Sequence, residues 1–131
     1  MKRMLALTAL FTIALAGCAT HETGVRDPQI FRAVADRFVL LSERPHAEVA
    51  ACFQERAALL PMSAFVAASD QQIIYRLRGF GYTFEEIDFD ASNAGSMVTV
   101  MIAPGVNDRW RRDFTRDRLR PLQDCAAALA S

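Results

Sequence analysis

Residues 72–90 read QIIYRLRGFGYTFEEIDFD, and this stretch decides the fold. On each side of Gly79-Phe80-Gly81 apolar and other side chains alternate, as in strands with one face in a core. The central Gly-Phe-Gly has the composition of a turn, so the stretch predicts a hairpin of residues 72–78 and 82–90. A four-residue loop would place Arg76 opposite Glu85, a favourable cross-strand charge pair.

Two further strands are expected beside this hairpin. Residues 97–103 are apolar on both faces apart from Thr99, which predicts a central strand covered on both sides. Residues 64–67 are expected to form a short edge strand. The sequence therefore predicts a sheet of three or four antiparallel strands.

Helices are predicted before and after these strands. Asp27-Pro28 has the composition of a helix start, and apolar residues at helical spacing predict a helix over residues 28–41. Pro45 opens a second predicted helix over residues 45–60, in which Cys52 faces the core.

A last helix is predicted to begin at Asn107 or Asp108, and Pro121 within it predicts a kink or break near Arg120. The expected fold over residues 27–131 is a single α+β two-layer domain. Its helices pack on the antiparallel sheet in the order α-α-β-β-β-α.

The first 18 residues have the composition of an export signal. Lys2 and Arg3 precede an apolar run from Met4 to Ala16, which is shorter than the roughly 20 residues of a membrane-spanning helix. The run ends in Leu15-Ala16-Gly17-Cys18, which resembles the lipobox of bacterial lipoproteins. The resemblance implies that residues 1–17 are removed and that Cys18 carries a diacylglycerol and an acylated amino terminus, such as palmitate.

The same resemblance implies a location. In lipoproteins of two-membrane bacteria an Asp after the anchor favours the inner membrane, so Ala19 implies the periplasmic face of the outer membrane. Residues 18–26 would form a lipidated tether. The eight residues after the anchor span at most about 28 Å, from roughly 3.5 Å per residue, so the domain is expected to stay near the membrane.

Composition excludes several classes of function. Without the signal, 13 basic and 15 acidic residues remain, a formal net charge of −2, so no nucleic acid is expected as a partner. His21 and His46 lack the spacing of zinc ligands, so neither a metal nor a cofactor is expected. Ser42 is not in a Gly-x-Ser-x-Gly motif, and no catalytic residue is predicted.

The number of cysteines predicts a disulfide bond. If Cys18 carries lipid, Cys52 and Cys125 are an even number in an exported chain, and we predict a disulfide between them. Two buried free thiols are the alternative. A cysteine in an early helix, Gly95-Ser96 before an apolar strand and a cysteine in a closing helix also resemble small proteobacterial lipoproteins. That resemblance implies no particular activity.

An arginine-rich segment is the first candidate binding surface. Its acidic and basic residues have helical spacings that support ion pairs, namely Asp108 with Arg112, Asp113 with Arg116 and Asp117 with Arg120. One interpretation is a solvent-exposed face crossed by salt bridges. The other is a surface that contacts phosphates of lipopolysaccharide or phospholipid. Its candidate residues are Arg109, Arg112, Arg116 and Arg120.

An acidic group is the second candidate. Glu86, Asp88 and Asp90 alternate along one strand, and Glu85 lies beside them. Alternating acids are typical of the solvent-exposed face of an antiparallel strand, and this is the interpretation that we adopt. The alternative is the paired carboxylates of a glycosidase or a set of calcium ligands.

The sequence favours a non-catalytic envelope lipoprotein, a binding or assembly-support module whose partner is another envelope protein or an anionic glycolipid. The alternative is a small envelope enzyme that acts on glycan through its acidic strand face. An inhibitor of a foreign enzyme is a third hypothesis that the sequence does not separate from the first.

Overall fold

The computed structural model describes residues 23–128. The expected signal segment 1–17, the anchor Cys18 and the first part of the expected tether lie outside the described residues. Within this range, no helix is both long and apolar enough to cross a membrane.

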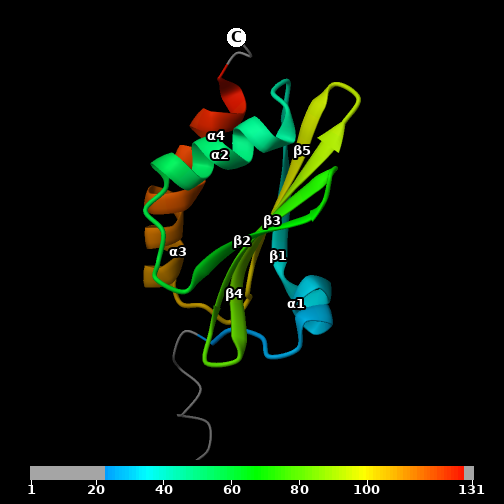
Figure 1. Ribbon diagram of the computed structural model, residues 1–131. Helices are drawn as coiled ribbons and strands as arrows, with labels where there is room; N and C mark the ends of the chain where they lie inside the picture. The colour runs from blue at the N-terminus through cyan, green and yellow to red at the C-terminus, as the bar shows by residue number, and fades with distance from the viewer. Residues whose placement is uncertain (1–22, 129–131) are drawn as a thin grey trace, which may run out of the picture.

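The described residues contain one antiparallel sheet, with the strands in the spatial order β1-β5-β4-β3-β2 (Figure 1). The strand predicted from residues 97–103 corresponds to β5, which pairs with β1 on one side and with the middle strand β4 on the other. It therefore has the expected interior position. The short strand predicted from residues 64–67 lies at an edge, also as expected. The strands are β1 (Asp36–Ser42), β2 (Ser63–Ser69), β3 (Gln72–Gly79), β4 (Tyr82–Ser92) and β5 (Gly95–Ile102).

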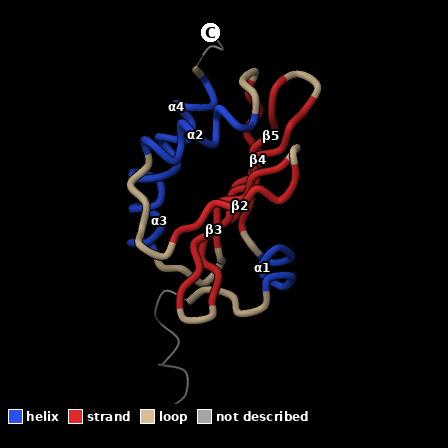
Figure 2. The backbone as a smooth tube through the Cα atoms, in the orientation of Figure 1, coloured by secondary structure: helices blue, strands red, loops and turns tan. Residues whose placement is uncertain are grey.

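Most of the helical segments cover one face of this sheet, here called the inner face (Figures 1 and 2). They are α2 (His46–Arg56), α3 (Asp108–Phe114), the π-helical turn η2 (Thr115–Leu119) and α4 (Arg120–Ala127), of which the last three run on without a break. The short α1 (Pro28–Val34) lies at one end of the opposite, outer face. The α+β class is confirmed, with five strands where three or four were predicted.

An aromatic cluster fixes α2 on the inner face. The Phe53 ring lies 5.2 Å from the Tyr75 ring and 5.8 Å from the Phe89 ring, between centroids. Phe65 adds a contact at 6.0 Å. Such pairs contribute about 0.5–1.5 kcal/mol each beyond the area that they bury. The cluster therefore joins α2 to β2, β3 and β4.

The predicted helix over residues 28–41 is wrong beyond Val34. Asp27 caps its start as expected, since its carboxylate accepts the N–H groups of Gln29 and Ile30 at 2.8 and 3.1 Å. The chain then becomes extended at Ala35 and continues as β1, which pairs with β5 along its whole length. Residues 38–41 are all apolar, so they fit a strand as well as a helix, and a partner distant in sequence decides between them. The element order is therefore α-β-α-β-β-β-β-α.

The β3–β4 hairpin is confirmed, but its register is predicted only in part. The loop is Phe80-Gly81, and the residue pairs beside it keep the expected register. An irregularity next to Arg78 then shifts the pairing by one residue, so Arg76 opposes Glu86 rather than Glu85. Because successive side chains point to opposite faces, this shift assigns Glu85 to the inner face and Glu86 to the outer face.

Candidate functional site

One side of the closing helix carries a row of arginines. Asn107 caps this helix, as its side-chain oxygen accepts the Trp110 N–H at 2.9 Å. Residues three and four apart share a face of a helix. Side chains from successive turns thus line an open depression of about 660 Å³, here called the arginine groove. Its lining residues are Asp108, Arg111, Arg112, Thr115, Arg116 and Arg120.

The arginine groove contains three of the four arginines that the sequence singled out, namely Arg112, Arg116 and Arg120. Arg109 lies on another side of the helix, where it lines a separate depression of about 270 Å³ with Leu60 and Trp110. Arg111 lines the groove although the sequence analysis did not place it there. Helical spacing would have indicated this position, because Arg111 lies four residues before Thr115, which also lines the groove.

A π-helical turn separates the arginines that point outward from the one that points inward. In η2 the Arg120 N–H bonds to the Thr115 carbonyl, five residues earlier. This wider turn rotates the residues that follow relative to a regular α-helix. As a result Arg118 is buried, with 2 % of its surface exposed, while Arg116 remains exposed.

Pro121 accounts for part of this irregularity. A proline has no N–H, so the carbonyl four residues earlier, that of Asp117, loses its helical partner. The Asp117 carbonyl instead accepts the N–H of Ala58 at 2.9 Å, from the loop after α2. The predicted effect of Pro121 on the helix is thus seen as a π-helical turn rather than as a break of the chain direction.

Ion pairs neutralise some of the groove's arginines. The Arg111 guanidinium lies 2.8 Å from Asp36 of β1. Arg116 lies 2.6 Å from Asp117 and 3.2 Å from Asp113, so the predicted Asp113–Arg116 pair is confirmed. The hydrogen bond from Arg116 lowers the pKa of the Asp117 carboxyl. These carboxylates bind two of the groove's guanidinium groups.

Of the four arginines that line the groove, Arg112 and Arg120 are exposed and remain without such an ion pair. Among residues 23–128, no carboxylate lies within ion-pair distance of either, so the predicted pairs with Asp108 and Asp117 do not form. A guanidinium presents a planar set of N–H donors that matches phosphate and carboxylate oxygens. The arginine groove therefore offers two guanidinium groups to an anionic ligand.

The acidic strand face is not solvated, and that interpretation was wrong. Glu86 and Asp88 are 1 % and 3 % exposed. The Arg32 guanidinium of α1 bonds to the Glu86 carboxylate and lies 2.7 Å from that of Asp88, while Arg76 bonds to Glu86 at 2.9 Å. No local pattern in the sequence indicates Arg32 as the partner, because α1 is distant in sequence from β4.

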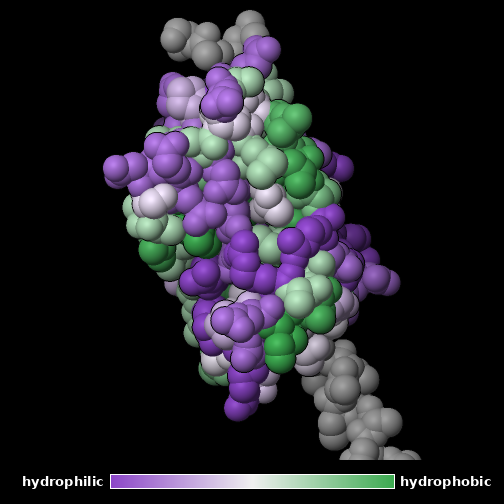
Figure 3. Space-filling view, turned by 90° about the vertical axis from the view of Figure 1, so that its right-hand side faces the viewer, coloured by the Kyte–Doolittle hydropathy of each residue, from purple (hydrophilic) through white to green (hydrophobic). Residues whose placement is uncertain are grey.

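The acidic side chains of β4 on the outer face are thus bound by side chains of α1 and β3. Asp90 accepts a hydrogen bond from Gln72 at 2.7 Å. In Figure 3, which views this side, hydrophilic side chains cross the middle of the molecule and hydrophobic groups lie apart above and below them. Carboxylates held by guanidinium groups in this way do not resemble a glycosidase pair, whose acid and base must face a substrate.

Glu85 forms a second buried network, on the inner face, and it is fully buried. Its carboxylate accepts hydrogen bonds from the Arg118 Nε and Nη2 atoms at 2.7 and 2.6 Å. It also accepts one from the Tyr75 hydroxyl and one from the Trp110 indole, each at 2.9 Å. Burial, and then the charge of Glu85, raises the pKa of Tyr75, which therefore stays a neutral donor. These contacts satisfy the carboxylate and join the closing helix to the sheet.

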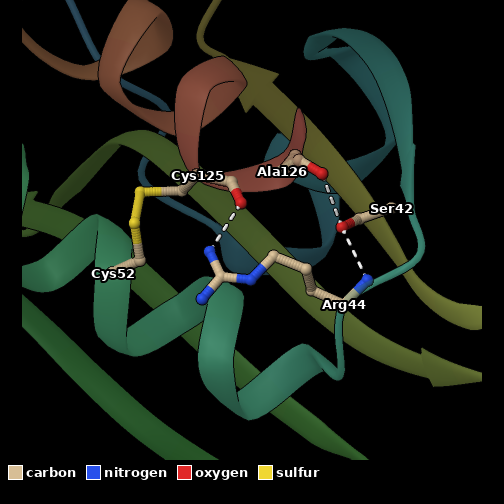
Figure 4. The surroundings of a disulfide bond; sticks show 5 residues. All are labelled: Ser42, Arg44, Cys52, Cys125 and Ala126. Carbon is tan, nitrogen blue, oxygen red and sulfur yellow. Dashed lines mark hydrogen bonds between the residues drawn. A yellow bond between two sulfur atoms is a disulfide. The ribbon is translucent and has the colours of Figure 1, made fainter. Parts of the chain in front are cut away.

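A disulfide joins α2 to α4, as predicted (Figure 4). The Cα atoms of Cys52 and Cys125 are 5.7 Å apart. Beside it, the Ser42 hydroxyl donates to the Ala126 carbonyl at 2.7 Å, and Arg44 donates to the Cys125 carbonyl at 2.8 Å. The last carbonyls of a helix lack partners within it. Ser42 and Arg44 thus cap α4, and Ser42 has a structural role.

Gly95-Ser96 belongs to this joint. The Ser96 hydroxyl donates to the Arg44 carbonyl at 2.9 Å. Gly95 has a φ of +141°, and a Cβ there would meet the Ser42 carbonyl oxygen and the Glu43 backbone. The residues that carried the second resemblance, two cysteines and a Gly-Ser pair, therefore meet at one place in the fold.

Replacing Gly95 by alanine is expected to lower the free energy of unfolding by about 2 kcal/mol, because it adds backbone strain and crowds Ser42. Urea unfolding monitored by circular dichroism measures the change. Gly81→Ala is the control, since its φ of +83° is also unfavourable but no atom lies within 4 Å of the added Cβ. Equal losses in the two variants would show that the contact with Ser42 contributes nothing.

No protein-family model matches this chain, and no curated protein matches it.

The two remaining features that the sequence raised are His46 and a metal site. His46 lies at the start of α2 and is half-buried. Within residues 23–128, no three His, Cys, Asp or Glu side chains are arranged to hold a metal ion.

Proposed function

We propose that this protein is a non-catalytic lipoprotein of the cell envelope, which binds the phosphates of an anionic glycolipid through its arginine groove. The observation that carries the proposal is the groove itself. Arg112 and Arg120 project from it without carboxylate partners in the described part of the chain. Guanidinium groups in an open depression suit a charged, water-exposed headgroup better than an apolar ligand.

The lipobox at residues 15–18 supports the anchoring part of the proposal. An acylated Cys18 and the following Ala19 would hold the protein on the periplasmic face of the outer membrane. Two acyl chains give stable attachment, whereas one gives only marginal attachment. A ligand that lies in the same membrane would then be at high effective concentration, so weak binding by a few arginines would suffice.

The buried carboxylates argue against the alternative, an enzyme that acts on glycan. Such an enzyme needs one carboxyl group to give a proton and another to act as base or nucleophile. Here Glu86 and Asp88 bind Arg32, and Glu85 binds Arg118. We therefore favour a binding module over an enzyme.

The proposal predicts that Arg112→Gln/Arg120→Gln weakens binding to lipopolysaccharide about thirtyfold, since each of the two exposed charge-assisted contacts contributes on the order of 1 kcal/mol. Binding is measured by titrating the purified protein with lipopolysaccharide in an isothermal calorimeter. The control is Arg56→Gln/Arg109→Gln, which removes the same charge from exposed positions outside the groove.

Three comparisons decide the outcome. Dephosphorylated lipopolysaccharide should bind as weakly to the native protein as intact lipopolysaccharide binds to the groove variant. Equal loss in the groove and control variants would mean that only net charge matters, which contradicts the groove. Retention of an envelope protein by the native chain but not by the groove variant, without glycolipid binding, would assign the groove to a protein partner. The intact mass of the mature chain tests the acyl groups on Cys18 separately.

A further inference from the structure

The tip of the β3–β4 hairpin exposes an aromatic side chain in an unfavourable backbone conformation. Phe80 has a φ of +54° and Gly81 a φ of +83°, the conformation of a two-residue turn that favours Asn-Gly. Phe80 is also 87 % exposed, more than any other large apolar residue in the described range. Neither feature stabilises the isolated fold. A local cost of this kind points to a role outside the fold.

Phe80 lines an apolar groove of about 420 Å³. Met62 forms part of its wall and packs against Gly79, and Leu60 lies beside it. Leu60 and Met62 are 39 % and 48 % exposed. Phe84 and Trp110 also line the groove, and their stacked rings are 5.1 Å apart between centroids. An exposed aromatic tip beside an apolar groove is suited to an apolar surface larger than a small ligand.

Cationic and amphipathic side chains surround this apolar tip. Arg26 lies over the Tyr82 ring, 5.1 Å from its centroid, and donates to the Tyr82 hydroxyl at 3.0 Å. Arg78 donates to the Gly81 carbonyl at 3.1 Å. Aromatic residues with arginines at their margin are typical of protein segments that lie at a membrane–water interface.

The chain enters the fold beside this tip. Val25 and Thr83 exchange two backbone hydrogen bonds, each of 2.9 Å. The Thr23 hydroxyl donates a hydrogen bond to the Gly105 carbonyl at 3.5 Å. Cys18 precedes Thr23 by five residues, which span at most about 18 Å when fully extended. The start of the described chain and the β3–β4 turn lie at the same end of the molecule, opposite the end of α4 (Figure 1).

We infer that the β3–β4 tip, with Phe80 at its centre, inserts into the lipid surface to which the chain is anchored. The inference rests on the proposed acylation of Cys18, because the short connection to Thr23 brings this end of the molecule against the membrane. Phe80, Leu60 and Met62 would enter the interface, and Arg26 and Arg78 would face the lipid phosphates. The domain would then have a fixed orientation on the membrane.

The single tryptophan provides the test, because Trp110 lines the groove next to Phe80. The mature protein is reconstituted in vesicles of phosphatidylethanolamine and phosphatidylglycerol with brominated acyl chains, which quench nearby indoles. Quenching of Trp110 is expected in the native protein. In Phe80→Asn the ratio of docked to undocked protein should fall about tenfold, since a buried phenyl group is lost.

Phe80→Asn is not expected to unfold, because Asn suits the positive φ at this position better than Phe. The control is Leu41→Thr, which removes a 77 % exposed apolar side chain from β1 at the other end of the sheet. Equal quenching in the native protein and in Phe80→Asn would overturn the inference. So would a dimer in sedimentation that Phe80→Asn dissociates without lipid, since a second copy would then occupy the groove.

The intact mass of the same samples separates this inference from the proposed function. A protein without acyl groups would contradict the anchor. Vesicles added to that protein still test the tip: Phe80-dependent quenching would support insertion, and its absence would overturn it.

Discussion

An Arg118→Met variant is expected to lose about 3–5 kcal/mol of unfolding free energy, because it leaves a buried carboxylate without its counter-charge. Glu85 is fully buried and accepts two short hydrogen bonds from Arg118. Methionine keeps much of the apolar stem that packs in the core, so the loss reports mainly on the charge. A typical domain of this size is stable by only about 5–15 kcal/mol. Urea unfolding at neutral pH measures the effect.

A double variant tests this explanation. Glu85→Gln/Arg118→Met removes both charges. The glutamine keeps one oxygen, which can accept from the Trp110 indole, while its NH2 group can donate to the Tyr75 hydroxyl oxygen. It should recover at least half of the stability that the single variant loses, because the unpaired buried charge is gone. If the double variant is less stable than Arg118→Met, the arginine contributes through packing rather than through charge.

Removal of the disulfide is the second large effect. Cys52 and Cys125 are 73 residues apart, and closing a loop of that length restricts the unfolded chain by about 4 kcal/mol in the chain-entropy model. Cys52→Ala/Cys125→Ala should therefore unfold at a much lower urea concentration than the oxidised protein.

The reduced native protein is the control for that variant. It keeps both sulfur atoms in the core, so it separates the loss of the cross-link from the loss of packing. The two should differ by less than about 1 kcal/mol if the cross-link accounts for the effect. A reduced protein as stable as the oxidised one would contradict the entropic explanation.

Local patterns predicted the elements whose signals are local. The alternation around Gly79-Phe80-Gly81 predicted the hairpin, and Asn107 predicted the cap of the last helix. Pro121 predicted a kink or break near Arg120, where the structure has a continuous helix with a π-helical turn. The even number of cysteines that remain without Cys18 predicted the Cys52–Cys125 disulfide. For the hairpin and the helix cap, a few neighbouring residues determine the conformation. The disulfide joins residues that are 73 apart, and only that even number predicted it.

Elements that depend on distant partners were predicted poorly. Residues 38–41 are apolar without interruption, and only pairing with β5 makes them a strand. Glu86 and Asp88 have the spacing of a solvated face, yet Arg32 of α1 covers them. A sequence pattern states which side chains share a face, but it does not state what lies against that face.

The candidate site shows the same division. Helical spacing brought Arg112, Arg116 and Arg120 together correctly, because they lie one turn apart. The same spacing also places Arg111 in the groove with Thr115, while Arg109 lies on another side of the helix. That Arg111 is paired could not be predicted, because its partner Asp36 belongs to β1, which is distant in sequence.

The pairing of β1 with β5 has a consequence for biosynthesis. The first strand to leave the ribosome has its hydrogen-bonding partner among the last residues of the sheet, so no partial chain can complete the ladder. Long-range closure of this kind is slow compared with the formation of a hairpin. A nascent chain of this sequence should therefore remain without its complete sheet until translation is nearly finished.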